Sequence, residues 1–179
     1  MNVSHTSTSF NIANRVADWL KAQGCTHAFG VVGGGNLTLF EAISRRLTVV
    51  SCHHEQAAAM AATYFYRVSR RIAPVLVTAG AGSVNAFTGV MAAHFDSIPL
   101  LVISGNERSK FFGAPHNRSV GFQGFDPQDV VLTFTKYAYR TPSAAGAMRC
   151  LEGAWQKALQ PRQGAVWLDI PQDIANEVV

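Results

Sequence analysis

Residues 47–67 read LTVVSCHHEQAAAMAATYFYR, and this stretch decides the fold class. Residues 47–51 are typical of a buried strand, and the alanine-rich segment that follows favours a helix. The strand leads almost directly into a helix whose first turn contains Glu55. In open α/β sheets, ligands bind at the carboxyl ends of the strands. Glu55 is therefore a candidate functional residue.

Two opposed effects act on a carboxylate at the start of a helix. The helix dipole favours the charged form, whereas burial beneath a ligand favours the neutral form. A carboxyl group balanced between these effects can hold or pass a proton near neutral pH. The alternative is that Glu55 is an ordinary first-turn glutamate that complements the helix dipole.

Strand and helix patterns alternate along the rest of the chain. We expect further strands at residues 27–31, 74–78, 98–104, 137–140 and 165–170, and further helices at 9–23, 37–45, 84–94, 127–134 and 144–159. This alternation predicts a three-layer α/β fold, flavodoxin-like, with a mainly parallel six-stranded sheet and helices on both faces. Residues 107–126 show neither period, and a loop of that length usually serves function.

The helix expected at residues 37–45 has a candidate cap in Asn36. Asparagine is favoured there because its side-chain oxygen accepts a hydrogen bond from a free backbone N–H group. The helical period places Leu37, Phe40 and Ile43 on one buried stripe.

The chain has 179 residues, of which 48% are hydrophobic and 15% are charged. These values describe one globular domain that is large enough to bury a core. Residues 1–8 are polar and are expected to form a flexible arm, which leaves residues 9–179 as the domain. Part of the apolar surface is expected to face another subunit, with residues 84–94 and 95–99 as candidates.

Charge and cysteine content argue against several classes of function. The net charge of +4 is thinly spread and no basic run contains aromatic residues, so nucleic-acid binding is not expected. Three scattered cysteines and the absence of an HExxH motif predict no metal ligands in this chain. No signal peptide or membrane-spanning run is present, so we expect a cytoplasmic protein without a membrane partner.

Three expected strands end in glycine-rich or polar turns, at residues 33–36, 79–85 and 105–106. Right-handed crossovers would bring these turns to the same edge of the sheet as Glu55. Three consecutive glycines, at residues 33–35, could cradle a phosphate at the start of a helix. They match neither the GxGxxG nor the P-loop motif, and simple tight turns are the alternative.

Six segments, taken in order, resemble one known module. They are FGVVGGGNLTLFEAI (29–43), HHEQAAAMAATYFYR (53–67), VTAGAGSVNAFTGVMAAHFDSIPLLVISG (77–105), GFQGFD (121–126), FTKYAYR (134–140) and VWLDIPQDI (166–174). This set resembles the N-terminal, pyrimidine-binding (Pyr) domain of thiamine-diphosphate enzymes of the acetolactate synthase and 2-oxo-acid decarboxylase family. The resemblance covers the chain from about residue 10 to residue 178.

The resemblance implies that Glu55 is catalytic. It corresponds to the family's glutamate that hydrogen-bonds N1′ of the cofactor aminopyrimidine, and it would relay the proton whose removal activates thiamine diphosphate. The other implied cofactor-binding residues are Val31, Val32, Gly33, Ala81, Gly82 and Asn85. Phe122 and Gln123 match the substrate side. His116 and Arg118 lie in the same loop, and their chemistry alone, not the resemblance, suggests contact with the substrate's carboxylate or acyl acceptor. The alternative for both is an ordinary position in a surface loop.

Three positions depart from the family pattern. The family commonly has proline where Val32 and Ala81 stand, and both replacements still suit contact with a pyrimidine ring. It commonly has an acid where Gly124 stands, and this departure puts acetolactate synthesis itself in question.

Nothing in the sequence resembles the family's diphosphate-binding (PP) domain, which holds Mg²⁺, or its central domain. The resemblance places the active site between a Pyr and a PP domain. We therefore expect a PP-domain partner subunit that binds Mg²⁺ and shares the thiamine diphosphate, in a hetero-oligomer with two copies of each chain. The pair would decarboxylate a 2-oxo acid and could ligate the product to an acceptor.

Met1 and an end that coincides with the end of the Pyr domain favour a natural subunit, with an N-terminal fragment of a longer enzyme as the alternative. Two other hypotheses remain open. One is a non-catalytic regulatory or binding module with the same fold, and the other is a flavodoxin-like nucleotide-binding domain.

Overall fold

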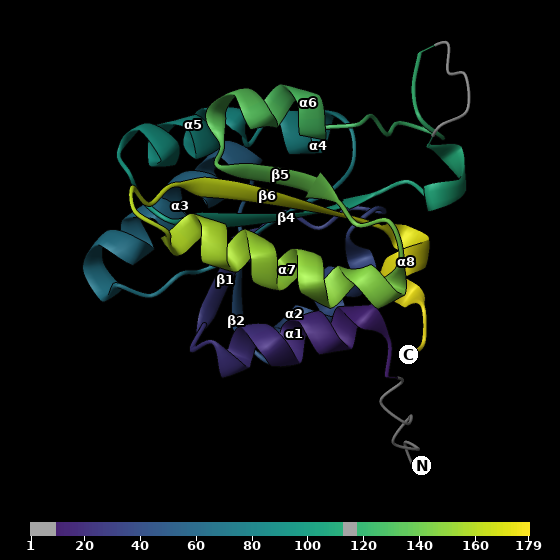
Figure 1. Cartoon of the computed structure of the whole chain (residues 1–179), viewed down its shortest axis with the longest axis horizontal. Helices are drawn as coiled ribbons and strands as arrows, with labels where there is room; N and C mark the ends of the chain where they lie inside the picture. The colour runs from purple at the N-terminus through teal and green to yellow at the C-terminus, as the bar shows by residue number, and fades with distance from the viewer. Residues whose placement is uncertain (1–9, 113–117) are drawn as a thin grey trace.

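A parallel sheet forms the middle layer of the chain (Figure 1). The computed structural model describes residues 10–112 and 118–179, and these contain six strands in the order β2-β1-β3-β4-β6-β5. Their bounds are β1 His27–Gly30, β2 Thr48–Ser51, β3 Val75–Val77, β4 Leu100–Asn106, β5 Tyr137–Arg140 and β6 Ala165–Pro171. All neighbouring strands pair in parallel, which confirms the predicted fold class. The arm expected at residues 1–8 lies outside the described residues.

Helices cover both faces of the sheet (Figure 1). On one face lie α1 Ile12–Ala22, α2 Leu37–Ser44, α7 Ala144–Leu159 and α8 Gln172–Asn176. On the other face lie α3 Glu55–Ser69, α4 Ala81–Val84, α5 Phe87–Phe95 and α6 Gln128–Val131. Two short 3-10 helices, at Ser109–Phe111 and Leu132–Phe134, lie in the connections between elements. The three predicted layers are therefore present.

The centre of the sheet is apolar on both sides. Every residue of β4 and of β6 is buried, as expected for parallel strands that are covered on two faces. Along β4, Leu101 and Ile103 join the cluster beneath α1 and α7, whereas Val102 faces the opposite cluster beneath α3 and α5. Alternate side chains therefore tie the two helical layers to one strand.

Strand β2 was predicted to be buried, and that prediction is wrong. In the described sheet β2 is an edge strand paired with β1, and three of its four residues are exposed. Threonine and valine favour strands at an edge as well as in a core, so composition alone did not distinguish the two.

Two details of the expected helices are also wrong. The helix expected at residues 84–94 starts earlier and is broken, because Ala86 N–H bonds to the carbonyl of Ser83 and separates α4 from α5. In α2, Leu37 is 56% exposed, and the buried residues are Leu39, Ala42 and Ile43. The stripe is shifted on the helix surface, because a short helix accommodates several stripes with spacings of three and four residues.

Candidate functional site

Glu55 is the first residue of α3, directly after the turn that follows β2. His54 is the N-cap, and its Nδ1 atom accepts a hydrogen bond from the backbone N–H of Gln56 at 3.2 Å. A histidine therefore closes the strand–helix turn. It also turns Glu55 inward, where its side chain is only 6% exposed.

The turn after β3 meets the Glu55 carboxylate. Asn85 donates a hydrogen bond from Nδ2 to Oε2 of Glu55 at 2.9 Å. A Cβ atom built on Gly82 would lie 3.1 Å from Oε1, so the backbone approaches the carboxylate closely because this residue is glycine. Within the described residues Oε1 accepts no hydrogen bond from protein, which leaves one carboxylate oxygen for another donor. Ala81 is exposed at the start of α4.

The turn after β1 is held by Asn36, which is buried. Its Oδ1 accepts from the N–H of Gly33 at 2.7 Å, and its Nδ2 donates to the carbonyl of Val31 at 3.0 Å. The prediction that this side chain caps α2 is wrong, since it makes no capping hydrogen bond. It instead clamps the turn, and Val32 between its two partners is half exposed.

Missing side chains let three turns pack against one another. A Cβ on Gly33 would lie 2.7 Å from Thr78, and one on Gly105 would lie 2.1 Å from the carbonyl oxygen of Gly35. The turns after β1, β3 and β4 therefore meet at the carboxyl edge of the sheet, as predicted. This edge includes the boundary between β1 and β3 where the strand order reverses, a common position for ligand sites.

The substrate-side candidates lie in the loop that precedes α6. The carbonyl oxygen of Gln123 would be 2.3 Å from a Cβ on Gly80, so this loop rests on the turn that leads to Gly82. Phe122 is 89% exposed, and Arg118 is exposed as well. His116 lies outside the described residues.

Glu107 is a residue near this loop that the sequence analysis did not single out. Its Oε1 accepts a hydrogen bond from the N–H of Gln123 at 3.2 Å. A Cβ on Gly124 would lie 2.5 Å from Cγ of Glu107. The space beside Gly124, where the family pattern led us to expect an acid, therefore contains the side chain of Glu107. The sequence did offer a signal for Glu107, because it is an acidic residue directly after a strand predicted to be buried.

A buried polar network behind the loop was also missed. Asp169 in β6 accepts hydrogen bonds from Ser104 Oγ and from Asn106 Nδ2, the latter at 2.9 Å. Asn106 also donates to the carbonyl of Phe125 at 3.0 Å. Burial raises the pKa of Asp169 to about 7, against the opposing effect of these hydrogen bonds. The network joins β4 and β6 to the substrate-side loop.

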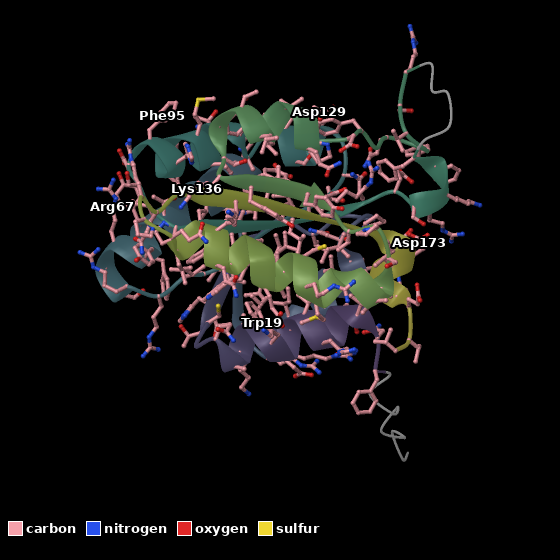
Figure 2. The ribbon with its side chains drawn as sticks, viewed as in Figure 1. Trp19, Arg67, Phe95, Asp129, Lys136 and Asp173 are labelled. Carbon is pink, nitrogen blue, oxygen red and sulfur yellow. The ribbon has the colours of Figure 1, made fainter. Side chains whose placement is uncertain are left out.

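The opposite edge of the sheet has a different character. A cleft of about 880 Å³ lies there, among the starts of β1 and β2 and the ends of the first three helices, and its basic lining residues are Lys21, Arg45, Arg46, Arg70 and Arg71. Figure 2 shows Arg67 and Lys136 toward this edge and Asp173 at the other. Basic residues stabilise the negative ends of helices, which accounts for them without a ligand. The cleft is remote from Glu55.

Residues 10–112 and 118–179 contain neither a metal-binding cluster nor a membrane-spanning helix. No group of three or more histidine, cysteine, aspartate or glutamate side chains could hold a metal ion. No helix in these ranges combines the length and the apolar character that crossing a bilayer requires.

The parallel sheet, its glycine turns and the carboxylate at their meeting point define an α/β domain with a candidate ligand site at the strand ends. The chain belongs to the thiamine pyrophosphate enzyme family, because the family model for the N-terminal TPP-binding domain matches residues 10–130. Thiamine pyrophosphate, or TPP, is thiamine diphosphate.

Curated relatives agree with this assignment. The isozyme 2 large subunit of acetolactate synthase from Escherichia coli K12 is 33% identical over 165 residues, which cover 92% of this chain and 29% of that protein. The acetolactate synthase large subunit of Lactococcus lactis is 33% identical over 163 residues, which cover 90% of this chain and 28% of that protein. The chain thus spans less than a third of the length of these relatives.

Proposed function

We propose that this chain is the pyrimidine-binding part of a thiamine-diphosphate enzyme that decarboxylates a 2-oxo acid and can join the product to an acceptor, as acetolactate synthases do. The observation that carries the proposal is the buried Glu55 carboxylate, with Oε2 held by Asn85 and Oε1 unused by the protein residues described. Membership of the TPP-binding family supports the choice of cofactor.

The residues at the sheet edge fit the aminopyrimidine of thiamine diphosphate. Gly82 leaves space beside the carboxylate, because a Cβ there would lie 3.1 Å from Oε1 of Glu55, and Gly33 lets the turn after β1 pack against Thr78. Val31 and Val32 offer apolar contacts, and Val32 is half exposed. Ala81 and Asn85 lie at the two ends of the short helix α4, on the other side. An open carboxylate oxygen between apolar and amide contacts suits a heteroaromatic ring with a hydrogen-bond donor.

Each residue has a definable role in this proposal. Oε1 of Glu55 would exchange a proton with a bound aminopyrimidine, while Asn85 fixes Oε2 and so sets the orientation of the carboxylate. Asn36 keeps the turn after β1 in place through Val31 and Gly33. The bound cofactor supplies the carbon nucleophile and the electron sink for decarboxylation. Phe122 and Gln123 would contact the 2-oxo acid from the side of the loop.

We propose that the other half of the site comes from a PP domain, which binds the metal and the diphosphate, as the resemblance of this chain to the Pyr domain implies. Such a domain could belong to a separate partner subunit, in a hetero-oligomer with two copies of each chain, or to the same longer polypeptide. The cysteines described, Cys25, Cys52 and Cys150, are free, which is consistent with the reducing cytoplasm.

Replacement of Glu55 by Gln tests the proposal in the assembled enzyme. The amide keeps the shape but cannot exchange the proton, so we expect thiamine-diphosphate-dependent decarboxylation of 2-oxo acids to fall about 10²- to 10⁴-fold. Assembly, measured by sedimentation, is expected to be unchanged. The matched control is Glu152→Gln at an exposed position of α7. Full activity of E55Q would contradict the catalytic role, and no turnover by the wild type would indicate a regulatory or binding module.

A further inference from the structure

The turn that presents Phe122 and Gln123 is closed by its own backbone. Val120 and Gly124 form an isolated antiparallel bridge, in which each N–H donates to the other's carbonyl at 2.8 Å. Val120 is buried, whereas Phe122 and Gln123 are exposed. The bridge fixes the shape of the turn but does not fix where the turn lies relative to the sheet.

Glu107 supplies that second constraint. It follows the last residue of β4, and its backbone N–H donates to Oδ1 of Asn106 at 2.9 Å. Its side chain passes beneath the turn, where Oε1 accepts from the N–H of Gln123. A Cβ on Gly121 would lie 2.8 Å from Oε2 of the same carboxylate. The carboxylate is thus enclosed by the turn on two sides.

The two glycines of the turn are needed for different reasons. Gly121 has φ +61°, a backbone conformation that residues with a side chain adopt only at a cost in free energy. A side chain there would also collide with the carboxylate of Glu107. Gly124 has no positive φ, so only the surrounding atoms exclude a side chain. These atoms are Cγ of Glu107 at 2.5 Å, and Asn106 Oδ1 and the Val120 carbonyl oxygen, both at 2.8 Å from a Cβ. The turn is therefore shaped around Glu107.

The same turn contacts the region of Glu55. The carbonyl of Gln123 rests on Gly80, and Gly82, two residues later, adjoins the Glu55 carboxylate. A displacement of the turn would consequently move Gln123 relative to the proposed proton-transfer site. The carbonyl group of Gln123 faces Gly80, whereas its backbone N–H group donates to the side chain of Glu107, which directly follows β4.

We infer that Glu107 is a positioning residue, which sets the location of Gln123 and Phe122 at the substrate side of the site. The inference deepens the proposed function and rests on it for the role of the turn as the substrate side. Glu107 acts through Gln123 and is not assigned contact with substrate or cofactor. The competing explanation is a half-buried surface glutamate whose replacement has no effect on the turn.

Three replacements of Glu107 separate hydrogen bonding from filling of space. Glu107→Gln keeps a side-chain oxygen acceptor, Glu107→Met keeps the bulk without the acceptor, and Glu107→Ala removes both. The control Glu152→Ala removes an exposed glutamate from α7, a helix that does not belong to the turn. Hydrogen exchange of the Gln123 backbone amide, followed by NMR on the chain itself, is the measurement. Urea unfolding confirms that each variant is folded.

Loss of the hydrogen-bond acceptor predicts an increase in exchange of about tenfold or more for E107M and E107A, with E107Q and E152A close to wild type. Wild-type exchange in E107M would overturn the positioning role. The exchange measurement needs no cofactor. A negative result would therefore contradict the positioning role of Glu107 without bearing on the proposed function.

A second measurement addresses the substrate side in the assembled enzyme. We expect E107A to raise KM for the 2-oxo acid about tenfold and E107Q to restore it, while thiamine diphosphate affinity stays within about twofold. Faster amide exchange with unchanged KM and kcat would overturn the assignment of this turn to the substrate side.

Discussion

At the scale of single residues, the candidate site depends on where Cβ atoms are absent. The three glycines at residues 33–35 look equivalent in the sequence, but their surroundings differ. A Cβ on Gly33 would meet three side-chain atoms of Thr78 at 2.7 Å, whereas one on Gly34 would meet nothing within 4 Å. Thr78 has little freedom to move away, because its Oγ1 accepts the N–H of Gly35 at 3.1 Å.

The variants Gly33→Ala and Gly34→Ala are therefore expected to differ. For G33A, steric conflict with Thr78 is expected to lower the free energy of unfolding by about 1–3 kcal/mol. For G34A, which has open space and no positive φ, we expect a change between zero and a gain of about 1 kcal/mol. Urea denaturation of both variants measures the difference. Equal effects would show that the turn does not pack against Thr78 as described.

At this scale the sequence predicted local geometry where local rules apply, whereas the roles of these residues in a cofactor site stay predictions. Glu55 was placed correctly at a helix start after a strand, and Gly82 and Asn85 do adjoin it. Asn36 was misassigned as a cap because its role as a clamp depends on the three-dimensional path of the turn. Glu107 was missed because its partner, Gln123, is sixteen residues away in a loop without a regular period.

At the scale of secondary-structure elements, β4 and β6 are joined by polar as well as apolar contacts. Trp167 donates from Nε1 to Ser104 Oγ at 2.8 Å, and Ser104 donates to Asp169. Asp126 and Arg140, which pair with each other, lie near enough to influence the pKa of Asp169 in opposite directions. Burial is the largest effect, so this carboxyl group retains its proton to higher pH in the folded state than in the unfolded state.

Asp169 is expected to make stability fall as pH rises toward 8. Its folded pKa of about 7 exceeds the ordinary value of 3.8, so between these values the folded state binds more protons than the unfolded state. The free energy of unfolding is then expected to decrease by about 1 kcal/mol between pH 6.5 and pH 8. Burial and nearby cations lower the pKa of His94 from 6.5, so that histidine contributes mainly below this window.

Urea denaturation at several pH values, with Asp169→Asn as the comparison, measures this slope. The variant loses the titrating group and is expected to show a flatter dependence, whatever its absolute stability. The same slope in both proteins would assign the pH dependence to other groups.

The elements that the sequence predicted best have unambiguous local signals. The helix α7 and the strand β5 have the predicted bounds, and α7 has sixteen residues with a clear amphipathic period. The short helix α8 was missed, because five residues show no period. The exposure of β2 could not be predicted because strand order, which makes it an edge, is decided by tertiary packing.

At the scale of the whole molecule, α3 presents an apolar stripe on its outer side. Met60, Tyr64 and Val68 follow a four-residue spacing, and the last two are 63% and 88% exposed. Phe95, at the end of the neighbouring α5, is exposed as well. We propose that a PP-domain partner covers this stripe, because exposed apolar patches mark protein–protein interfaces.

Replacement of Tyr64 by Glu is expected to weaken assembly without unfolding the chain. The side chain is mostly exposed, so the free energy of unfolding should change by no more than about 0.5 kcal/mol. A charge in a covered apolar surface is expected to weaken association with the PP-domain part at least about tenfold, as measured by sedimentation equilibrium. The control is Gln156→Glu on α7, and equal effects of the two variants would place the interface elsewhere.

The edge position of β2 also determines how this polypeptide behaves on its own. One flank of Thr48–Ser51 offers unsatisfied amide and carbonyl groups, and the strand contains no proline or lysine to block a newcomer. Extended segments of unfolded neighbours can add there as a further strand. Crowding during overproduction would then cause aggregation from this flank, so the same strand that leads to Glu55 also limits the solubility of the isolated polypeptide.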